Sequence, residues 1–246
     1  MIQRAWMMGW SAAFVLVAAC GDGGGAASPA ADTQTIDAAD TASAADDTGP
    51  SVEPDTTPVV PDPPVDTYPP GPYGAEYLET IDPELSFYDP WADRDIKLRD
   101  YWLDPNTNVI LISSAAGWCT ACMYEAWDLV DAYEKYHPDG FEILYTMYAD
   151  PQDLPLWDDA HRREQDMAFM NDWHDNVGKY IDLDPVKVTN YPLLVDIGYK
   201  MGEFYDKSAT PFTIMVRTRD MKVIYRAIGY GAGSIEHHIK TALYSN

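Results

Sequence analysis

Residues 117–125 read Gly-Trp-Cys-Thr-Ala-Cys-Met-Tyr-Glu and place two cysteines between a predicted strand and a predicted helix. Before them, residues 108–113 form a short apolar, β-branched run that is typical of a buried strand. After them, apolar side chains recur at helical spacing until a proline and a glycine at positions 138 and 140. The sequence therefore predicts Cys119 at or just before the first turn of a helix.

This position favours redox chemistry at the cysteines. Unpaired backbone N–H groups and the helix dipole stabilise an anion, so a thiol at a helix start ionises more readily than a free one. Cys119 is the predicted nucleophile, and Cys122, nearly one turn further on, can close a disulfide with it. The alternatives are a structural disulfide or half of a zinc site, although a zinc site needs a second ligand pair that the sequence does not offer. Haem attachment would need a histidine directly after Cys122, where Met123 stands.

The motif resembles that of a known family. Trp-Cys-x-x-Cys after a buried strand is similar to the thioredoxin superfamily, and the pattern Cys-x-x-Cys-x-x-Glu, which ends at Glu125, resembles its membrane-tethered, extracytoplasmic TlpA/ResA-like branch. Residues 209–216, Ala-Thr-Pro-Phe-Thr-Ile-Met-Val, resemble the segment in which a cis-proline precedes a central strand and faces the cysteines. The resemblance implies that Pro211 is cis and shapes a client groove, with Trp118 and Thr210 beside it. A proline that simply precedes a strand is the alternative.

The resemblance also implies a function. It implies a thiol-disulfide oxidoreductase that exchanges electrons with protein clients and with a membrane electron donor or acceptor. Its task would be the reduction of protein disulfides, for example in cytochrome c maturation. The redox-active Cys119–Cys122 disulfide would be its only redox group, with no cofactor and no metal.

Two departures from the family pattern affect these implications. Thr120 and Ala121 stand between the cysteines, where relatives usually carry a proline, so a reduction potential cannot be transferred from them. Ser113 occupies the position at which many thioredoxins carry a buried acid. Proton transfer would then depend on Glu125, one turn beyond Cys122 on the same face of the helix. Alternatively, Glu125 only complements the helix dipole.

The N-terminus predicts export and lipidation. Residues 1–19 have one early basic residue and a short apolar run, as in a signal peptide. Residues 17–21, Val-Ala-Ala-Cys-Gly, resemble a bacterial lipobox with Cys20 as the lipidated residue, and a free Cys20 after ordinary secretion is the alternative. We therefore expect a lipid-anchored protein of the bacterial cell envelope, facing the periplasm or the cell surface. Gly21 favours the outer membrane by analogy with enteric lipoproteins.

Composition divides the rest of the chain into two parts. Residues 20–72 are rich in Ala, Asp, Thr and Pro, with ten acidic residues and no Lys or Arg, which predicts a disordered acidic tether. Residues 73–246 contain six tryptophans and most of the tyrosines, enough for one thioredoxin-like domain. The formal net charge of −24 argues against a nucleic-acid partner, whose recognition needs a basic surface.

The predicted fold class is α/β, with a central mixed sheet flanked by helices, an N-terminal hairpin and an insertion before the cis-proline. The hairpin is expected around residues 87–98 and the insertion between residues 150 and 205. Further strands are expected at residues 141–148, 191–196, 212–217 and 222–227, and helices at residues 158–177 and 234–244, the last capped by Ser234.

Two other functions remain open at this stage. A non-catalytic, copper-binding lipoprotein could use the cysteines, or the imidazole and thioether groups in the predicted insertion helix, as ligands. These groups belong to His161, Met167, Met170 and His174, for which core packing and solvation are the simpler interpretation. A thiol peroxidase shares the fold, but its Pro-x3-Thr-x2-Cys pattern is absent.

Overall fold

The computed structural model describes residues 67–231 and 233–245. The predicted signal peptide, Cys20 and almost all of the predicted tether lie outside the described residues. Within the described part, no helix combines the length and apolar character needed to cross a membrane.

One mixed sheet of seven strands organises the described chain, in the order β2-β1-β5-β4-β3-β6-β7. The strands are β1 (Ser86–Asp89), β2 (Arg94–Lys97), β3 (Val109–Ala116), β4 (Phe141–Ala149), β5 (Leu193–Val195), β6 (Phe212–Arg217) and β7 (Lys222–Ile228). The α-helices are α1 (Thr120–Tyr136), α2 (Arg163–Asp175) and α3 (Ser234–Tyr244). Short 3-10 helices cover Leu98–Tyr101, His137–Asp139, Ala160–Arg162, Lys179–Ile181, Lys200–Glu203 and Lys207–Ala209.

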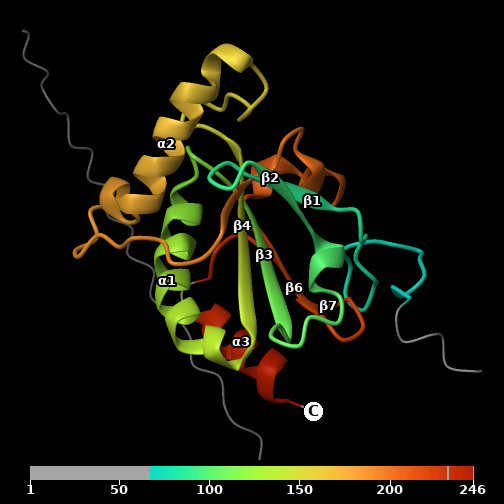
Figure 1. Cartoon of the computed structure of the whole chain (residues 1–246). Helices are drawn as coiled ribbons and strands as arrows, with labels where there is room; N and C mark the ends of the chain where they lie inside the picture. Colours follow the sequence, from blue (N-terminus) through green and yellow to red (C-terminus); the bar gives the residue numbers. More distant parts are fainter. Residues whose placement is uncertain (1–66, 232, 246) are drawn as a thin grey trace, which may run out of the picture. The chain divides into compact units, whose positions relative to one another are not determined.

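The central strands have the thioredoxin-like arrangement that the sequence predicts. β3 and β4 are parallel and joined through α1, while β6 is antiparallel to β3 and forms a hairpin with β7 before α3 (Figure 1). All eight residues of β3 are buried, as expected for a central strand covered on both faces. The predicted boundaries of β4 and β6 and the end of α1 before His137 are confirmed to within one residue.

Alternate residues of β3 face two separate hydrophobic cores. Val109, Leu111 and Ala115 belong to the core under α1, α2 and α3, whereas Ile110 and Ile112 belong to the core on the opposite face. Because side chains of a strand alternate between the two faces of a sheet, Ser113 lies on the α1 side and Ser114 on the other. This alternation decides which serine lies beside the cysteines.

The N-terminal hairpin is confirmed. β1 pairs with β2 along four residues and joins the sheet through one pairing between Tyr88 and Val195. The packed chain begins before the expected domain start at residue 73, because Tyr68 is buried and its hydroxyl donates to the carbonyl of Ile81.

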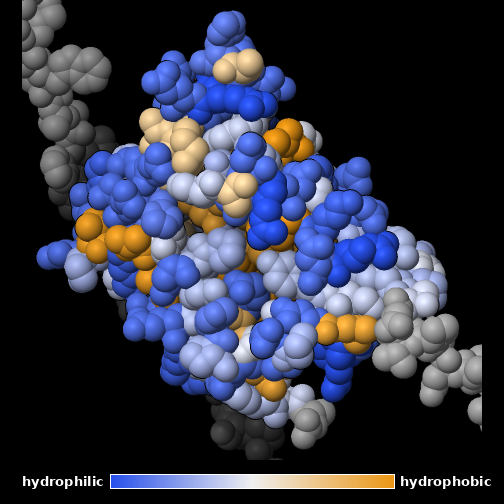
Figure 2. All heavy atoms as spheres, in the orientation of Figure 1, coloured by the Kyte–Doolittle hydropathy of each residue, from blue (hydrophilic) through white to orange (hydrophobic). Residues whose placement is uncertain are grey.

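The insertion before Pro211 is present, but its helix is shorter than predicted. The first turn, Ala160–Arg162, is a 3-10 helix whose start is capped by Asp159, and the α-helix begins only at Arg163. The predicted cap of the last helix is wrong. Gly233 occupies the N-cap of α3 with φ 73°, and the Ser234 hydroxyl donates to the carbonyl of Gly231. The surface seen in Figure 2 is largely hydrophilic, with apolar side chains in small separate patches.

Candidate active site

Cys119 and Cys122 form a disulfide at the N-terminus of α1. Cys119 is the N-cap residue, and its Sγ accepts a hydrogen bond from the backbone N–H of Cys122 at 3.0 Å. The same sulfur lies 3.7 Å from the carbonyl oxygen of Thr210. Cys119 is 4% exposed and Cys122 is fully buried, so Cys119 is the cysteine nearer to the solvent. The N-terminal position follows from the sequence, because the strand β3 ends three residues before Cys119 and the helix begins directly after it.

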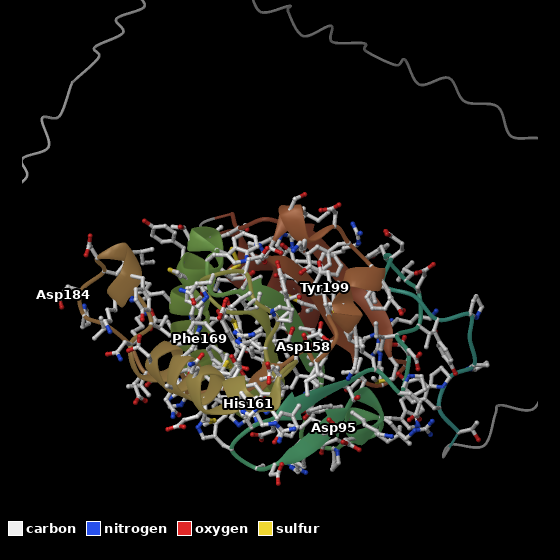
Figure 3. All side chains as sticks on the ribbon, turned by 90° about the horizontal axis from the view of Figure 1, so that it is seen from above. Asp95, Asp158, His161, Phe169, Asp184 and Tyr199 are labelled. Atoms are coloured by element: carbon white, nitrogen blue, oxygen red, sulfur yellow. A yellow bond between two sulfur atoms is a disulfide. The ribbon has the colours of Figure 1, made fainter. Side chains whose placement is uncertain are left out.

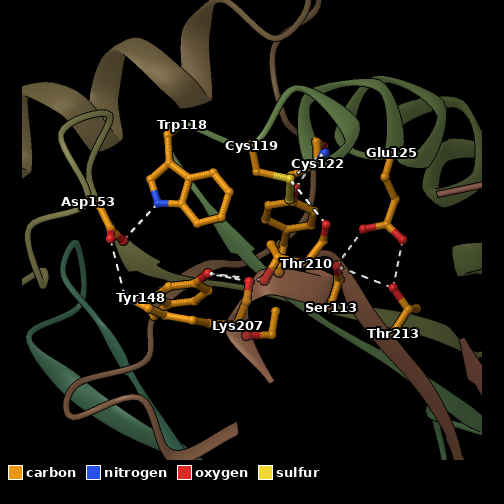
Figure 4. Close-up of a disulfide and its surroundings, with 12 residues drawn as sticks. Ser113, Trp118, Cys119, Cys122, Glu125, Tyr148, Asp153, Lys207, Thr210 and Thr213 are labelled. Atoms are coloured by element: carbon orange, nitrogen blue, oxygen red, sulfur yellow. Dashed lines mark hydrogen bonds and ion pairs between the residues drawn. A yellow bond between two sulfur atoms is a disulfide. The ribbon is translucent and has the colours of Figure 1, made fainter. Parts of the chain in front are cut away.

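Glu125 is buried behind the disulfide, between α1 and the sheet. Its Oε2 accepts a hydrogen bond from the Ser113 hydroxyl at 2.5 Å, and its Oε1 accepts one from the Thr213 hydroxyl at 2.6 Å (Figure 4). Ser113 and Thr213 are direct partners in the pairing of β3 with β6, which brings both hydroxyls under one carboxyl group. Glu125 follows Cys122 by three positions and therefore shares its face of the helix.

Burial raises the pKa of Glu125 above its ordinary value, and the two hydroxyl donors partly offset this increase. Glu125 is 2% exposed. An acid that merely complements the helix dipole would stand in solvent at the first turn, whereas this carboxyl group contacts the sheet. The arrangement suits a group that exchanges a proton with its neighbours.

A second group of side chains lies on the solvent side of the disulfide. Trp118 is 39% exposed, and its Nε1 donates to Asp153 Oδ1 at 2.9 Å. Lys207 Nζ donates to Asp153 Oδ2 at 3.1 Å (Figure 4). These two contacts, that of Lys207 first, lower the pKa of the Asp153 carboxyl. Asp153 thus connects the residue before Cys119 to the segment that leads into Pro211.

The loop that carries Asp153 is held by a buried ion-pair cluster. Asp150 accepts backbone hydrogen bonds through Oδ1, including one from Leu154, and its Oδ2 lies 2.6 Å from Arg162 Nη2. Arg162 also contacts Asp166 Oδ1 at 3.2 Å and the carbonyl of Pro155 at 2.7 Å. The cluster fixes both ends of the loop and so the position of Asp153.

Thr210 and Pro211 complete the rim opposite the disulfide. The peptide bond between them is cis, as the family resemblance implies. The Thr210 hydroxyl lies 3.0 Å from the Tyr148 hydroxyl and 3.3 Å from that of Tyr205. Tyr205 in turn donates to Ser114 at 2.8 Å. These contacts tie Thr210 to β3 and β4 and hold its carbonyl toward Cys119.

The structure brings six of the predicted site residues together: Trp118, Cys119, Cys122, Glu125, Thr210 and Pro211. The seventh, Cys20, lies outside the described residues. Four further residues at the site were not predicted from the sequence, namely Tyr148, Asp153, Lys207 and Thr213. Thr213 carried a weak signal, since it is a polar residue in the apolar run 212–216.

The residues considered for copper are not gathered at one point. Met170 is buried in the core under α1, whereas His161 is exposed on the 3-10 helix before α2. The His174 ring packs against Trp91, and its Nδ1 lies 2.7 Å from Asp175. Among the residues that the structure describes, no cluster of three His, Cys, Asp or Glu side chains is arranged for a metal ion.

The chain matches no protein-family model and no curated protein. Among solved structures it is similar to a candidate DsbE thiol:disulfide interchange protein from Chlorobium tepidum, at 15% identity and TM-score 0.47 over 69% of this chain and 99% of that one. It is similar to the exposed lipoprotein thioredoxin Etrx1 from Streptococcus pneumoniae, at 20% identity and TM-score 0.41 over 64% and 98%. It is also similar to the thioredoxin domain of a thiol-disulfide oxidoreductase from Bacteroides vulgatus, at 10% identity and TM-score 0.44 over 70% and 99%. The function must therefore be argued from the chain's own residues.

Proposed function

We propose that the protein is an extracytoplasmic thiol-disulfide oxidoreductase that reduces disulfides in client proteins. One observation carries the proposal: a Cys-x-x-Cys disulfide caps a helix, with the outer sulfur beside a cis-proline loop and a buried acid behind the inner one. A structural disulfide would need neither the buried carboxyl group nor the cis-proline loop against the outer sulfur.

The reduced protein begins the reaction through Cys119. The backbone N–H of Cys122 and the helix dipole stabilise the Cys119 thiolate. This thiolate attacks one sulfur of the client disulfide, forms a mixed disulfide and releases the other client sulfur as a thiolate. Thr210 and Pro211 position the client chain beside Cys119.

Cys122 completes the reaction. Its thiol is fully buried and must lose a proton before it can attack. Glu125 accepts this proton. Its raised pKa lies closer to that of a thiol than the pKa of an ordinary carboxyl group does, which favours proton transfer between them. The Cys122 thiolate then attacks Cys119 Sγ, closes the Cys119–Cys122 disulfide and releases the second client thiolate. Two electrons pass to the client disulfide, and its two thiolates take up one proton from Glu125, which becomes a carboxylate again, and one from the solvent.

The oxidised protein needs a reductant for another cycle. A dithiol carrier whose electrons come through the membrane would supply it, since the compartment outside the cytoplasm is oxidising. The signal-peptide pattern and the lipobox at Cys20 support this location. In such a place, disulfides in exported proteins are the client class, apocytochrome c being one example. A lipid on Cys20 and the acidic segment that follows it, to about residue 72, would tether the domain to the membrane.

Reduction of insulin by the purified chain, with dithiothreitol as the electron source, tests the proposal. We expect wild type to accelerate precipitation of the insulin B chain, and Cys119→Ser to abolish the acceleration. Ser234→Ala, a substitution of similar size on α3, is the matched control and should keep the wild-type rate. A wild-type rate no faster than that of dithiothreitol alone would contradict the proposal.

A further inference from the structure

A cavity of about 260 Å³ opens beside the disulfide, outside the group of residues that carries the redox chemistry. Its walls come from the end of β4, the loop that carries Asp153, and the segment around residues 198–207. The lining residues are Tyr148, Ala149, Asp153, Pro155, Asp158, Gly198, Tyr199 and Lys207. Sites for drug-sized ligands usually measure about 300–1,000 Å³, so this cavity suits a single long side chain.

Two contacts place the cavity one residue away from Cys119. Tyr148, in its wall, contacts the Thr210 hydroxyl, and the Thr210 carbonyl lies 3.7 Å from Cys119 Sγ. On the other side Asp153 accepts the hydrogen bond from Trp118, the residue before Cys119. A client whose cysteine reaches Cys119 therefore brings its neighbouring residues to the mouth of the cavity.

One carboxylate at the cavity, that of Asp158, is left without an ion-pair partner among the described residues. Lys207 and Asp153 form an ion pair at 3.1 Å and balance each other. Asp158 is exposed, and the structure gives its side chain no ion-pair partner within the described residues. In Figure 3, Asp158 and Tyr199 are labelled near the middle of the molecule, whereas Asp184 lies at its far edge. The uncompensated charge at this cavity is negative.

The apolar part of the wall is aromatic. The rings of Tyr148 and Tyr199 pack against each other with centroids 4.4 Å apart. Aromatic faces attract cations, and they also accommodate the aliphatic stem of a long basic side chain. The negative charge of the whole chain, −24, further raises the local concentration of basic clients.

We propose that this cavity is a specificity pocket for a lysine or arginine side chain next to the reactive cysteine of the client. The inference rests on the proposed function and names the substrate class of that site. Asp158 supplies the charge that the basic group meets, and the rings of Tyr148 and Tyr199 support its stem. The loop from Asp150 to Asp158 thus gives the insertion a role in client selection.

Short peptides whose cysteine forms a mixed disulfide with thionitrobenzoate test the inference. The Cys119 thiolate of the pre-reduced chain attacks the peptide sulfur, and the electron pair leaves with coloured thionitrobenzoate, so no further reductant is needed. Three peptides differ only in the residue beside cysteine, which is arginine, leucine or glutamate. We expect the second-order rate constant for arginine to exceed that for leucine about fivefold at low salt, with glutamate slowest and the differences shrinking as salt is added.

Two variants with the same charge change identify the source of the preference. Asp158→Asn is expected to lower the arginine rate and so to bring the arginine-to-leucine ratio close to one. Asp184→Asn, remote from the cavity, is expected to keep the wild-type ratio. Equal rates for arginine and leucine in wild type, or a ratio that falls equally in both variants, would overturn the inference while the proposed function stands. If wild type released thionitrobenzoate from no peptide, both would fail.

Discussion

The two sides of the Cys119–Cys122 disulfide are built from different parts of the chain. The inner side consists of Glu125, Ser113 and Thr213, which lie on α1, β3 and β6 and are buried in the sheet core. The outer side consists of exposed side chains from loops, in which Asp153 joins Trp118 to Lys207. The inner side is part of the thioredoxin-like framework, and the outer side depends on the insertion.

This difference separates two tasks. Burial raises the pKa of a carboxyl group, so the inner side is suited to proton transfer. Solvent screens charges on the outer side, so contacts there mainly shape the client groove. Changes on the inner side should therefore alter the chemical step, and changes on the outer side should alter stability of the loop or choice of client.

Glu125→Gln should have the largest effect on activity. The amide cannot accept the proton of Cys122, so closure of the disulfide should slow about 10²-fold at pH 7. The rate is measured by stopped-flow, as release of the client from a preformed mixed disulfide with Cys119. Thr213→Val keeps the acid but removes a donor that lowers its pKa, so its pH–rate profile should move to higher pH. A profile that stays unchanged in both variants would remove Glu125 from the reaction.

Arg162→Met should destabilise the loop that carries Asp153 on the outer side. The side chains of Arg162, Asp150 and Asp166 are 18%, 10% and 1% exposed, and the variant leaves two enclosed carboxylates without their partner. We expect the free energy of unfolding to fall by about 3 kcal/mol in urea titrations, the lower end of the range for a broken buried pair. Lys97→Ala removes an exposed ion pair with Glu84 and should leave the unfolding midpoint unchanged. Equal midpoints for the two variants would contradict the structural role of the Arg162 cluster.

The pH dependence of the free energy of unfolding should show whether Glu125, on the inner side, titrates. Because burial raises the pKa of Glu125 in the folded chain, its contribution to stability is fully present below the unfolded pKa and is lost as pH rises through the folded one. Glu125→Gln should therefore unfold at higher urea than wild type at pH 8, and the gap should close near pH 4. Each unit by which the pKa is raised contributes about 1.4 kcal/mol to the gap. A gap independent of pH would indicate that Glu125 is not titrating in this range.

Trp118→Phe should have the smallest effect and should be confined to protein clients. The variant keeps an aromatic face but loses the hydrogen bond to Asp153. At this exposed position we expect KM for a protein client to rise about twofold to threefold, with kcat unchanged. Reduction of a small disulfide such as oxidised glutathione is the control, and it should proceed at the wild-type rate. A slower chemical step in both assays would indicate that Trp118 takes part in the chemistry of the disulfide, which this account assigns to the inner side.

Local sequence patterns predicted most of the framework. The buried run before Cys119 and the helical spacing after it report on local structure, and the structure confirms the strand and helix that they predict. The cis bond at Pro211 was implied only by the family resemblance, because a lone proline does not reveal its isomer. The central fold follows because short connections and parallel pairing leave few ways to arrange these elements. The shorter insertion helix was missed because the Asp159 side chain caps a 3-10 turn before the α-helix. The start of α3 was missed because Gly233, with a positive φ, takes the N-cap position without a side-chain hydrogen bond.

The parts of the site that depend on long-range register were not predictable. Ser113 and Thr213 are 100 residues apart, and only their pairing across β3 and β6 brings both hydroxyls under Glu125. Asp153 lies near the start of the insertion and Lys207 lies just after its end, so their contact depends on how that segment folds back. A polar residue in an apolar strand was the one sequence signal for Thr213, whereas Asp153 was one of many acids.

Trapping of a mixed disulfide tests the central claim most directly, namely that Cys119 reacts with clients and Cys122 resolves the product. Reduced Cys122→Ser and Cys119→Ser chains would each be mixed with a disulfide-bonded client protein, and covalent complexes would be counted by intact mass. With Cys20 replaced by serine in both chains, we predict a stoichiometric complex through Cys119 in Cys122→Ser and none in Cys119→Ser, whose remaining thiol, Cys122, is buried. Equal trapping by both variants, or none by either, would contradict the account.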